Sequence, residues 1–227
     1  MSESNSTAID AMFAVGAHYG YSKTRRHPGN AKYIFGTKSK VDIIDLEKTE
    51  AMLEAAKAFV ASMKLGGKQI LFVGTKPEAK GKVKSAAEEI GMPSVTERWV
   101  GGVLTNYPEI KKRVIKLEDL RAKKEKNELD MYTKKERLLI DEEMARMSKN
   151  FSGIVNMKRS PDALFVVDPK KEYIAIAEAR QNDIPIIALM STDCNMKEVT
   201  YPILANDGSV GSIAYFIDAL VAAYKEA

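Results

Sequence analysis

Short apolar runs without polar alternation constrain the fold of this chain more than any other feature. The runs QILFV (69–73), ALFVV (163–167) and IPIIAL (184–189) stand between segments of helical character, and two shorter strand-like pieces, 94–97 and 202–204, extend the series. Strands buried on both faces have this uninterrupted apolar character, because helices cover both sides of the sheet. The repeated order of strand, helix and strand predicts an α/β fold with an open parallel sheet and helices on both faces.

One segment, residues 108–151, interrupts the series with two helical stretches of about 18 residues each. Thr133 and Glu136 have capping-box spacing at the start of the second stretch, and residues 127–132 join the two. We therefore predict an inserted, coiled-coil-like antiparallel helical hairpin that projects from the sheet. Its mixed charges are typical of solvated helices that form salt bridges, although such a hairpin would also offer a surface to a protein partner.

The charge distribution near the N-terminus points to an acidic partner. The net charge of the whole chain is +4, but residues 11–41 contain no carboxylate. This segment, the basic arm, leads from a short helix into two strand-like runs, 32–35 and 41–45, that predict a β-hairpin. Its lysines and arginines are Lys23, Arg25, Arg26, Lys32, Lys38 and Lys40. Uncompensated cations in this density are expected where a protein contacts phosphates; the alternative is a solvated arm without a partner.

Three parts are therefore expected. They are an N-terminal helix and basic arm with a β-hairpin (1–45), an α/β sheet domain (46–107 and 152–227) and the helical-hairpin insertion (108–151). The single cysteine, Cys194, cannot form an internal disulfide. The first ten residues lack a signal-peptide pattern, and no apolar run approaches the roughly 20 residues that span a bilayer. We expect a cytoplasmic protein without a membrane partner.

Motifs for catalysis or cofactor binding are incomplete. Residues 74–82 lie between a strand and a helix, but six residues separate Gly74 from Gly81, where the phosphate-binding loop has four. Asp168 and Asp193 each follow an apolar run, so they could hold a metal or act as bases at the sheet edge, or Asp168 could simply cap the next loop. We expect that this protein is not an enzyme and has no catalytic residue, metal, cofactor or small-molecule substrate. The alternative is an enzyme or switch that uses these two carboxylates.

The only tryptophan lies in the stretch ERWVGGVLTNY (97–107). In one interpretation Trp99 is a core residue, and the two following glycines make the turn into the hairpin. In the other, the glycines let an anion approach the backbone, Arg98 and Asn106 contact it, and a base could stack on Trp99. The basic run 111–113 would line the approach. The two interpretations are compatible.

Several specific motifs occur in one order along most of the chain. They are residues 16–36, 42–49, 70–76, 97–107, 160–179 and 182–189. Together they resemble the bacterial form of the small-subunit ribosomal protein S-two (S2) family. Two places depart from the family pattern: His27 stands where a tryptophan usually follows the paired arginines, and residues 206–213 lack an expected acidic pair and arginine.

The resemblance implies a flavodoxin-like sheet with an inserted helical hairpin, and neither catalysis nor a cofactor. It implies a structural constituent of the small ribosomal subunit that takes part in translation, binds small-subunit ribosomal RNA between head and body and assists assembly. Neighbouring ribosomal proteins would be partners, including the large multi-domain protein S-one. Carried over residue by residue, RNA contact is expected from Lys23, Arg25, Arg26, Arg98, Asn106, Lys111, Lys112, Lys158 and Arg159.

Overall fold

Five parallel strands form the central sheet. The computed structural model describes residues 2–227, with side chains from residue 8 onward. The strands are β4 (Ile70–Val73), β5 (Ser94–Val95), β6 (Ala163–Val167), β7 (Ile186–Met190) and β8 (Tyr201–Leu204). Their spatial order is β5-β4-β6-β7-β8, and every neighbouring pair is parallel. The order reverses between β4 and β6, which is the flavodoxin-like arrangement, so the predicted fold class is confirmed.

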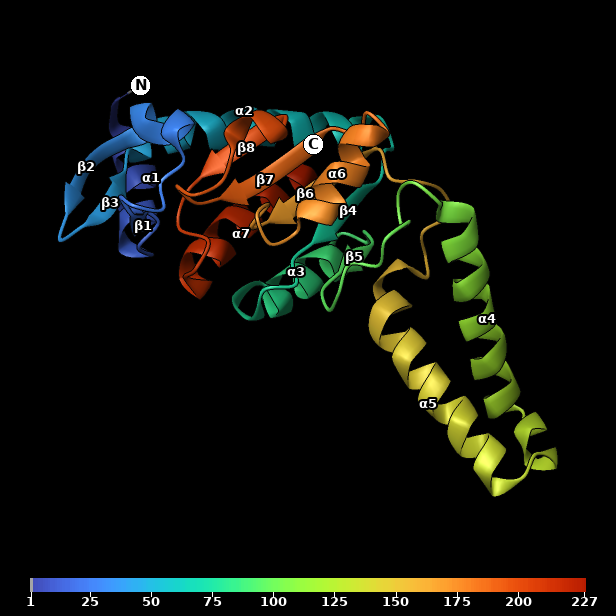
Figure 1. The fold of residues 1–227 in the computed structure, drawn as a ribbon. Helices are drawn as coiled ribbons and strands as arrows, with labels where there is room; N and C mark the ends of the chain where they lie inside the picture. The colour runs from blue at the N-terminus through green and yellow to red at the C-terminus, as the bar shows by residue number, and fades with distance from the viewer. Residues whose placement is uncertain (1) are drawn as a thin grey trace.

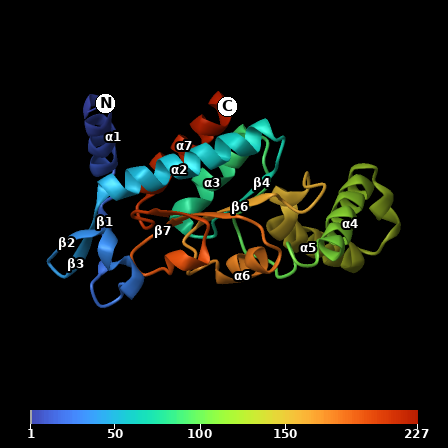
Figure 2. The same ribbon diagram turned by 90° about the horizontal axis from the view of Figure 1, so that it is seen from above.

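Helices cover both faces of this sheet, as Figure 2 shows. On one face lie α2 (Leu46–Leu65), α3 (Pro77–Glu89) and α7 (Val210–Glu226), and α6 (Tyr173–Gln181) lies on the other. Successive strand residues point to opposite faces, so Ile70 and Phe72 join one core cluster while Leu71 and Val73 join the other. Both clusters need apolar partners, which explains the uninterrupted apolar runs.

The segment between β5 and β6 forms the two long helices that leave the sheet in Figure 1. Helix α4 (Tyr107–Glu125) and helix α5 (Lys134–Phe151) are joined by the 3₁₀ turn η2 (Glu128–Met131). The capping box is present, since Thr133 N donates to Glu136 Oε2 at 2.9 Å and Glu136 N donates to Thr133 Oγ1 at 3.4 Å. A further 3₁₀ turn, η3 (Ser152–Ile154), leads from α5 back to the sheet.

The N-terminal part forms a second, antiparallel sheet. After α1 (Ser2–Ala14), strands β1 (Tyr19–Ser22), β2 (Ile34–Lys38) and β3 (Val41–Ile44) pair in the order β1-β3-β2. The hairpin of β2 and β3 turns through Ser39 and Lys40, whose φ angles of 50° and 67° suit a two-residue turn. The predicted hairpin exists, but β2 begins two residues later than predicted, because the 3₁₀ turn η1 (Pro28–Tyr33) includes Lys32 and Tyr33. Strand β1 was not predicted.

No helix within residues 2–227 combines the length and the apolar character that a membrane crossing requires.

Candidate nucleic-acid interface

The basic arm is docked on the loop that follows β7, at the carboxyl end of the sheet. Thr192 Oγ1 accepts a hydrogen bond from Tyr21 N at 3.0 Å, and Thr192 O accepts from His27 N at 2.9 Å and from Asn30 Nδ2 at 3.0 Å. A Cβ on Gly20 would lie 2.6 Å from Thr192 Cγ2, so only glycine allows this approach. The arm therefore covers part of the edge at which open α/β sheets usually bind ligands.

Both departures from the family pattern make local contacts in this docked arm. His27 Nδ1 accepts from Gly29 N at 3.2 Å and caps η1. Asn206 N donates to Ala17 O at 2.9 Å, and Asn206 Nδ2 donates to Gly16 O at 3.0 Å. Asn206 thus ties the turn that follows α1 to the sheet domain.

The two aspartates considered as metal ligands or bases are paired with lysines. Asp168 Oδ2 lies 3.2 Å from Lys76 Nζ, and Asp193 Oδ2 lies 2.8 Å from Lys170 Nζ. Asp168 Oδ1 also accepts from Lys171 N at 3.2 Å, so Asp168 caps the turn after β6 but not the helix, because α6 begins at Tyr173 with Glu172 at its N-cap. Among the described residues no three histidine, cysteine or acidic side chains are grouped as a metal site would require.

Asp207 shares Lys76 with Asp168, at 3.3 Å, but it is buried. Burial raises the pKa of Asp207 to about 6, with Asp168 acting in the same direction and Lys76 opposing. The pKa of Lys76 is itself raised, because the two carboxylates outweigh the opposing effect of burial. Lys76 therefore stays charged, while burial makes the charged form of Asp207 less favourable than it is in water.

The raised pKa of Asp207 predicts a pH dependence of stability. The folded state binds the proton more tightly than the unfolded state, so the contribution of Asp207 is greatest below the ordinary value of 3.8 and is lost as the pH rises to about 6. The free energy of unfolding of the wild type, minus that of Asp207→Asn, should fall by up to about 3 kcal/mol over this range, since one pKa unit corresponds to about 1.4 kcal/mol. Urea titrations at several pH values measure it; a constant difference would contradict the prediction.

Trp99 is a core residue. It is buried, and its Nε1 donates to Glu178 Oε1 at 3.0 Å. The same oxygen accepts from Gly102 N, while Glu178 Oε2 accepts from Leu104 N, Thr105 N and Thr105 Oγ1, all at 2.9–3.1 Å. Burial alone would raise the pKa of Glu178, but these hydrogen bonds outweigh burial and hold the pKa below its ordinary value. One buried carboxylate thus organises the turn that carries the chain into α4, and base stacking on Trp99 is excluded in this conformation.

The arm residues predicted to contact RNA differ in their surroundings. Lys23 and Arg25 are exposed, and the Arg25 guanidinium lies 5.2 Å from the centroid of the Tyr21 ring. Arg26 instead lies 3.6 Å from Asp42, whose side chain is fully buried. An RNA contact by Arg26 remains a prediction, but this ion pair means that Arg26 also holds the arm together.

The remaining predicted residues lie in the loops and helix beside the hairpin base. Arg98, Lys111 and Lys158 are exposed, and Asn106 is the exposed N-cap of α4, with no hydrogen bond from its side chain to the helix. Two cations of this group have acidic neighbours in sequence. Lys112 pairs with Glu109 at 2.6 Å, and Arg159 pairs with Asp162 at 2.9 Å. Such exposed pairs are weak and exchange readily for phosphate contacts.

The predicted residues therefore do not form one patch. Figure 1 shows the basic arm, in blue, and the hairpin, in green and yellow, at opposite ends of the sheet domain. Lys23, Arg25 and Arg26 belong to the arm end, and the other predicted residues belong to the hairpin end. Sequence reasoning did not include Lys38 and Lys40 among the site residues, although both flank or occupy the exposed turn between β2 and β3. The turn predicted between the two strand-like runs was the sequence signal that could have shown Lys38 and Lys40 to be exposed.

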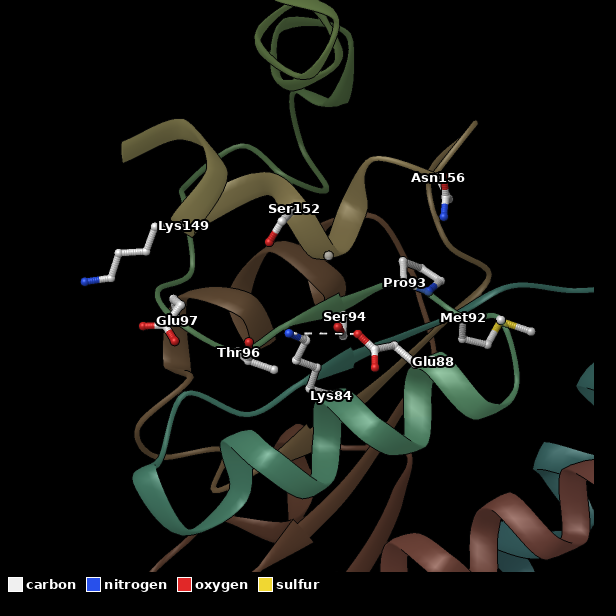
Figure 3. A pocket seen from close by; sticks show the side chains of 12 residues that line it. Lys84, Glu88, Met92, Pro93, Ser94, Thr96, Glu97, Lys149, Ser152 and Asn156 are labelled. Atoms are coloured by element: carbon white, nitrogen blue, oxygen red, sulfur yellow. Dashed lines mark ion pairs between the residues drawn. The ribbon is translucent and has the colours of Figure 1, made fainter. Parts of the chain in front are cut away.

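A hollow of about 650 Å³ lies between α3, the edge strand β5 and the end of α5 (Figure 3). Lys84 and Glu88 lie 3.9 Å apart on its α3 side. The described lining includes the hydroxyls of Ser94 and Ser152 but no histidine or cysteine, so no serine there has a histidine base. This hollow does not have the composition of an active site.

Comparison with known proteins agrees with this geometry. The family model described as "Ribosomal protein S2" matches residues 12–227. The small ribosomal subunit protein uS2 of Sulfurimonas denitrificans is 41% identical over 215 residues, which cover 95% of this chain and 83% of that protein. This chain therefore belongs to the ribosomal protein S2 family, whose members are structural proteins of the ribosome and not enzymes.

Proposed function

We propose that this protein binds small-subunit ribosomal RNA through cations at both ends of its sheet domain, and thereby helps to join the head and the body during assembly. The observation that carries the proposal is the basic arm. Its exposed cations include Lys23, Arg25, Lys38 and Lys40. Among the described side chains, none of these four forms an ion pair with a carboxylate.

Uncompensated cations of this kind are well suited to phosphates. A guanidinium group can hold two phosphate oxygens at once, and Arg25 is already oriented by the Tyr21 ring. Most such contacts position the protein without reading bases, because A-form RNA hides its base edges in a deep groove. Contacts at two opposite ends of a rigid sheet suit a protein that bridges two RNA elements.

We also propose that the arm end helps to dock protein S-one. Phe13, Tyr19 and Phe35 are 61%, 52% and 81% exposed, and all three belong to the N-terminal part. Exposed aromatic side chains are enriched where proteins meet. Probing the gradient fractions of the following experiment for S-one tests this part of the proposal.

The arm is tested by the double substitution Lys23→Glu/Arg25→Glu, with Lys68→Glu/Lys84→Glu as a control that has the same charge change on exposed residues of the sheet domain. The arm variant should fold normally and lose incorporation into small subunits in sucrose gradients. Its affinity for ribosomal RNA should fall roughly 10- to 100-fold, and its salt slope by about 1.5 to 2, since each phosphate contact contributes about 0.9. Normal incorporation of the arm variant, or an equal loss in the control, would refute the role of the arm.

A further inference from the structure

A second basic surface lies on the hairpin itself, around a cavity of about 510 Å³ between α4 and α5. The floor of this cavity includes Val100 and Met147, which are partly buried against the core. Its rim carries two arginines, one lysine and one amide: Arg113, Arg146, Lys116 and Asn150. The cavity thus combines an apolar floor with a cationic rim.

Helical spacing brings these polar groups together. Arg113 and Lys116 are three residues apart on α4, and Arg146 and Asn150 are four apart on α5, so each pair lies on one helix face. Lys116 Nζ also reaches Glu143 Oε1 across the two helices at 2.5 Å, so one cation of the rim has an acidic partner.

The two arginines have no such partner. Both are exposed, and within residues 8–227 neither forms an ion pair or a side-chain hydrogen bond. Other cations of the hairpin do reach a carboxylate across the two helices, as Lys124 reaches Asp141 at 2.6 Å. Three cations against the single carboxylate of Glu143 leave the cavity with a local charge of +2. This surplus favours an anionic ligand.

We propose that this cavity binds an unpaired nucleotide of RNA, with its phosphates on Arg113 and Arg146 and its base against Val100 and Met147. The inference rests on the RNA-binding function proposed above and adds the hairpin as a contact surface. The amide of Asn150 offers both a donor and an acceptor to the edge of the base.

An unpaired nucleotide fits this cavity better than duplex RNA or an acidic peptide. Duplex RNA presents phosphates but keeps its bases stacked, so the apolar floor would stay uncovered. Carboxylates of an acidic peptide could meet the arginines, yet they would supply no flat apolar group for the floor. Single-stranded RNA supplies both, because unstacked bases pack on apolar and planar side chains.

The test uses the full chain and measures fluorescence anisotropy with three probes: oligouridylate, an adenylate–uridylate duplex and polyglutamate. Arg113→Gln/Arg146→Gln removes the rim charges, and Lys134→Gln/Lys135→Gln is the matched control, since these lysines are exposed in the first turn of α5 without ion pairs among the described side chains. Asn150→Asp is an isosteric third variant that adds a negative charge. Circular dichroism confirms the fold of each variant.

The rim variant should lower the salt slope of oligouridylate binding by about 1.4, because each lost phosphate contact on a single strand contributes about 0.7. Asn150→Asp should weaken binding about fivefold, and the control should keep the wild-type slope. An equal loss in the control, or a loss of duplex or polyglutamate binding in the rim variant that is as large as its loss of oligouridylate binding, would overturn the proposal. If the wild type binds no RNA, the proposed function itself fails; if it binds RNA and the rim variant binds equally well, only this cavity assignment fails.

Discussion

Replacing Glu178 with alanine should lower the free energy of unfolding by about 4 kcal/mol or more, which approaches the total stability of many domains. The substitution removes the acceptor of five hydrogen bonds. The donors of two of these bonds, Trp99 Nε1 and Leu104 N, belong to buried residues, and the bonds from Gly102 N and Thr105 N are partly buried. Each unsatisfied buried donor costs about 1–3 kcal/mol, so even partial rescue by water leaves a large loss. Thermal and urea unfolding measure it.

Two comparisons separate this hydrogen-bond network from a general effect of the substitution. Glu88→Ala makes the same change on an exposed position of α3, where Glu88 lies 3.9 Å from Lys84 and has no other ion pair among the described side chains. It should cost less than about 0.5 kcal/mol. Glu178→Gln keeps the shape but turns an NH₂ group toward two or three donors, so it should be intermediate between wild type and Glu178→Ala. If Glu178→Gln is as stable as the wild type, the carboxylate is not what organises the turn.

The lowered pKa of Glu178 also predicts how its contribution to the free energy of unfolding changes with pH. The folded state holds the charged form more strongly than the unfolded state, so the stability that Glu178 contributes is present above its ordinary value of 4.5 and is lost as the pH falls below it. The difference between wild type and Glu178→Ala should therefore shrink in acid. This trend is distinct from that of Asp207, whose contribution declines as the pH rises.

The central sheet was predictable because its signal is local. Each buried strand must contact a core on both faces, so Ile70 through Val73 are all apolar and can be recognised without knowledge of their neighbours. The capping box at Thr133 and Glu136 is equally local, since both partners lie within one helical turn. Strand β1 was missed because its residues, YGYS, are half exposed and owe their conformation to pairing with β3, about twenty positions away.

The candidate site was predicted in composition but not in arrangement. The absence of carboxylates from residues 11–41 correctly located a group of exposed cations. Sequence alone could not show that Arg26 reaches the buried Asp42, which lies just outside that span. Nor could it show that Trp99 meets Glu178, because the two residues are 79 positions apart in the sequence, with the whole hairpin between them. The division of the cations between two ends of the molecule likewise depends on the order of strands, which local patterns do not encode.

Gly153 should be nearly as sensitive as Glu178, for a steric reason. It lies in η3, where the chain returns from α5 and packs along the edge strand β5. A Cβ on this residue would lie 2.1 Å from the backbone oxygen of Ser94, far closer than real atoms approach. Its φ is outside the left-handed region, so the requirement for glycine is one of space. Gly153→Ala should destabilise the protein by about 3 kcal/mol, as overpacking against rigid backbone does.

The same substitution at Gly81 is the matched control, and it should have the opposite sign. Gly81 lies within α3, is exposed, and has no atom within 4 Å of the position a Cβ would take. Gly81→Ala should therefore stabilise the protein by up to about 1 kcal/mol, because alanine favours the helix. Thermal unfolding of both variants checks that Gly153→Ala is destabilising and Gly81→Ala is stabilising. A neutral Gly153→Ala would mean that η3 can move away from β5 without cost, and the hairpin would then lack the fixed base that a bridge between two RNA elements requires.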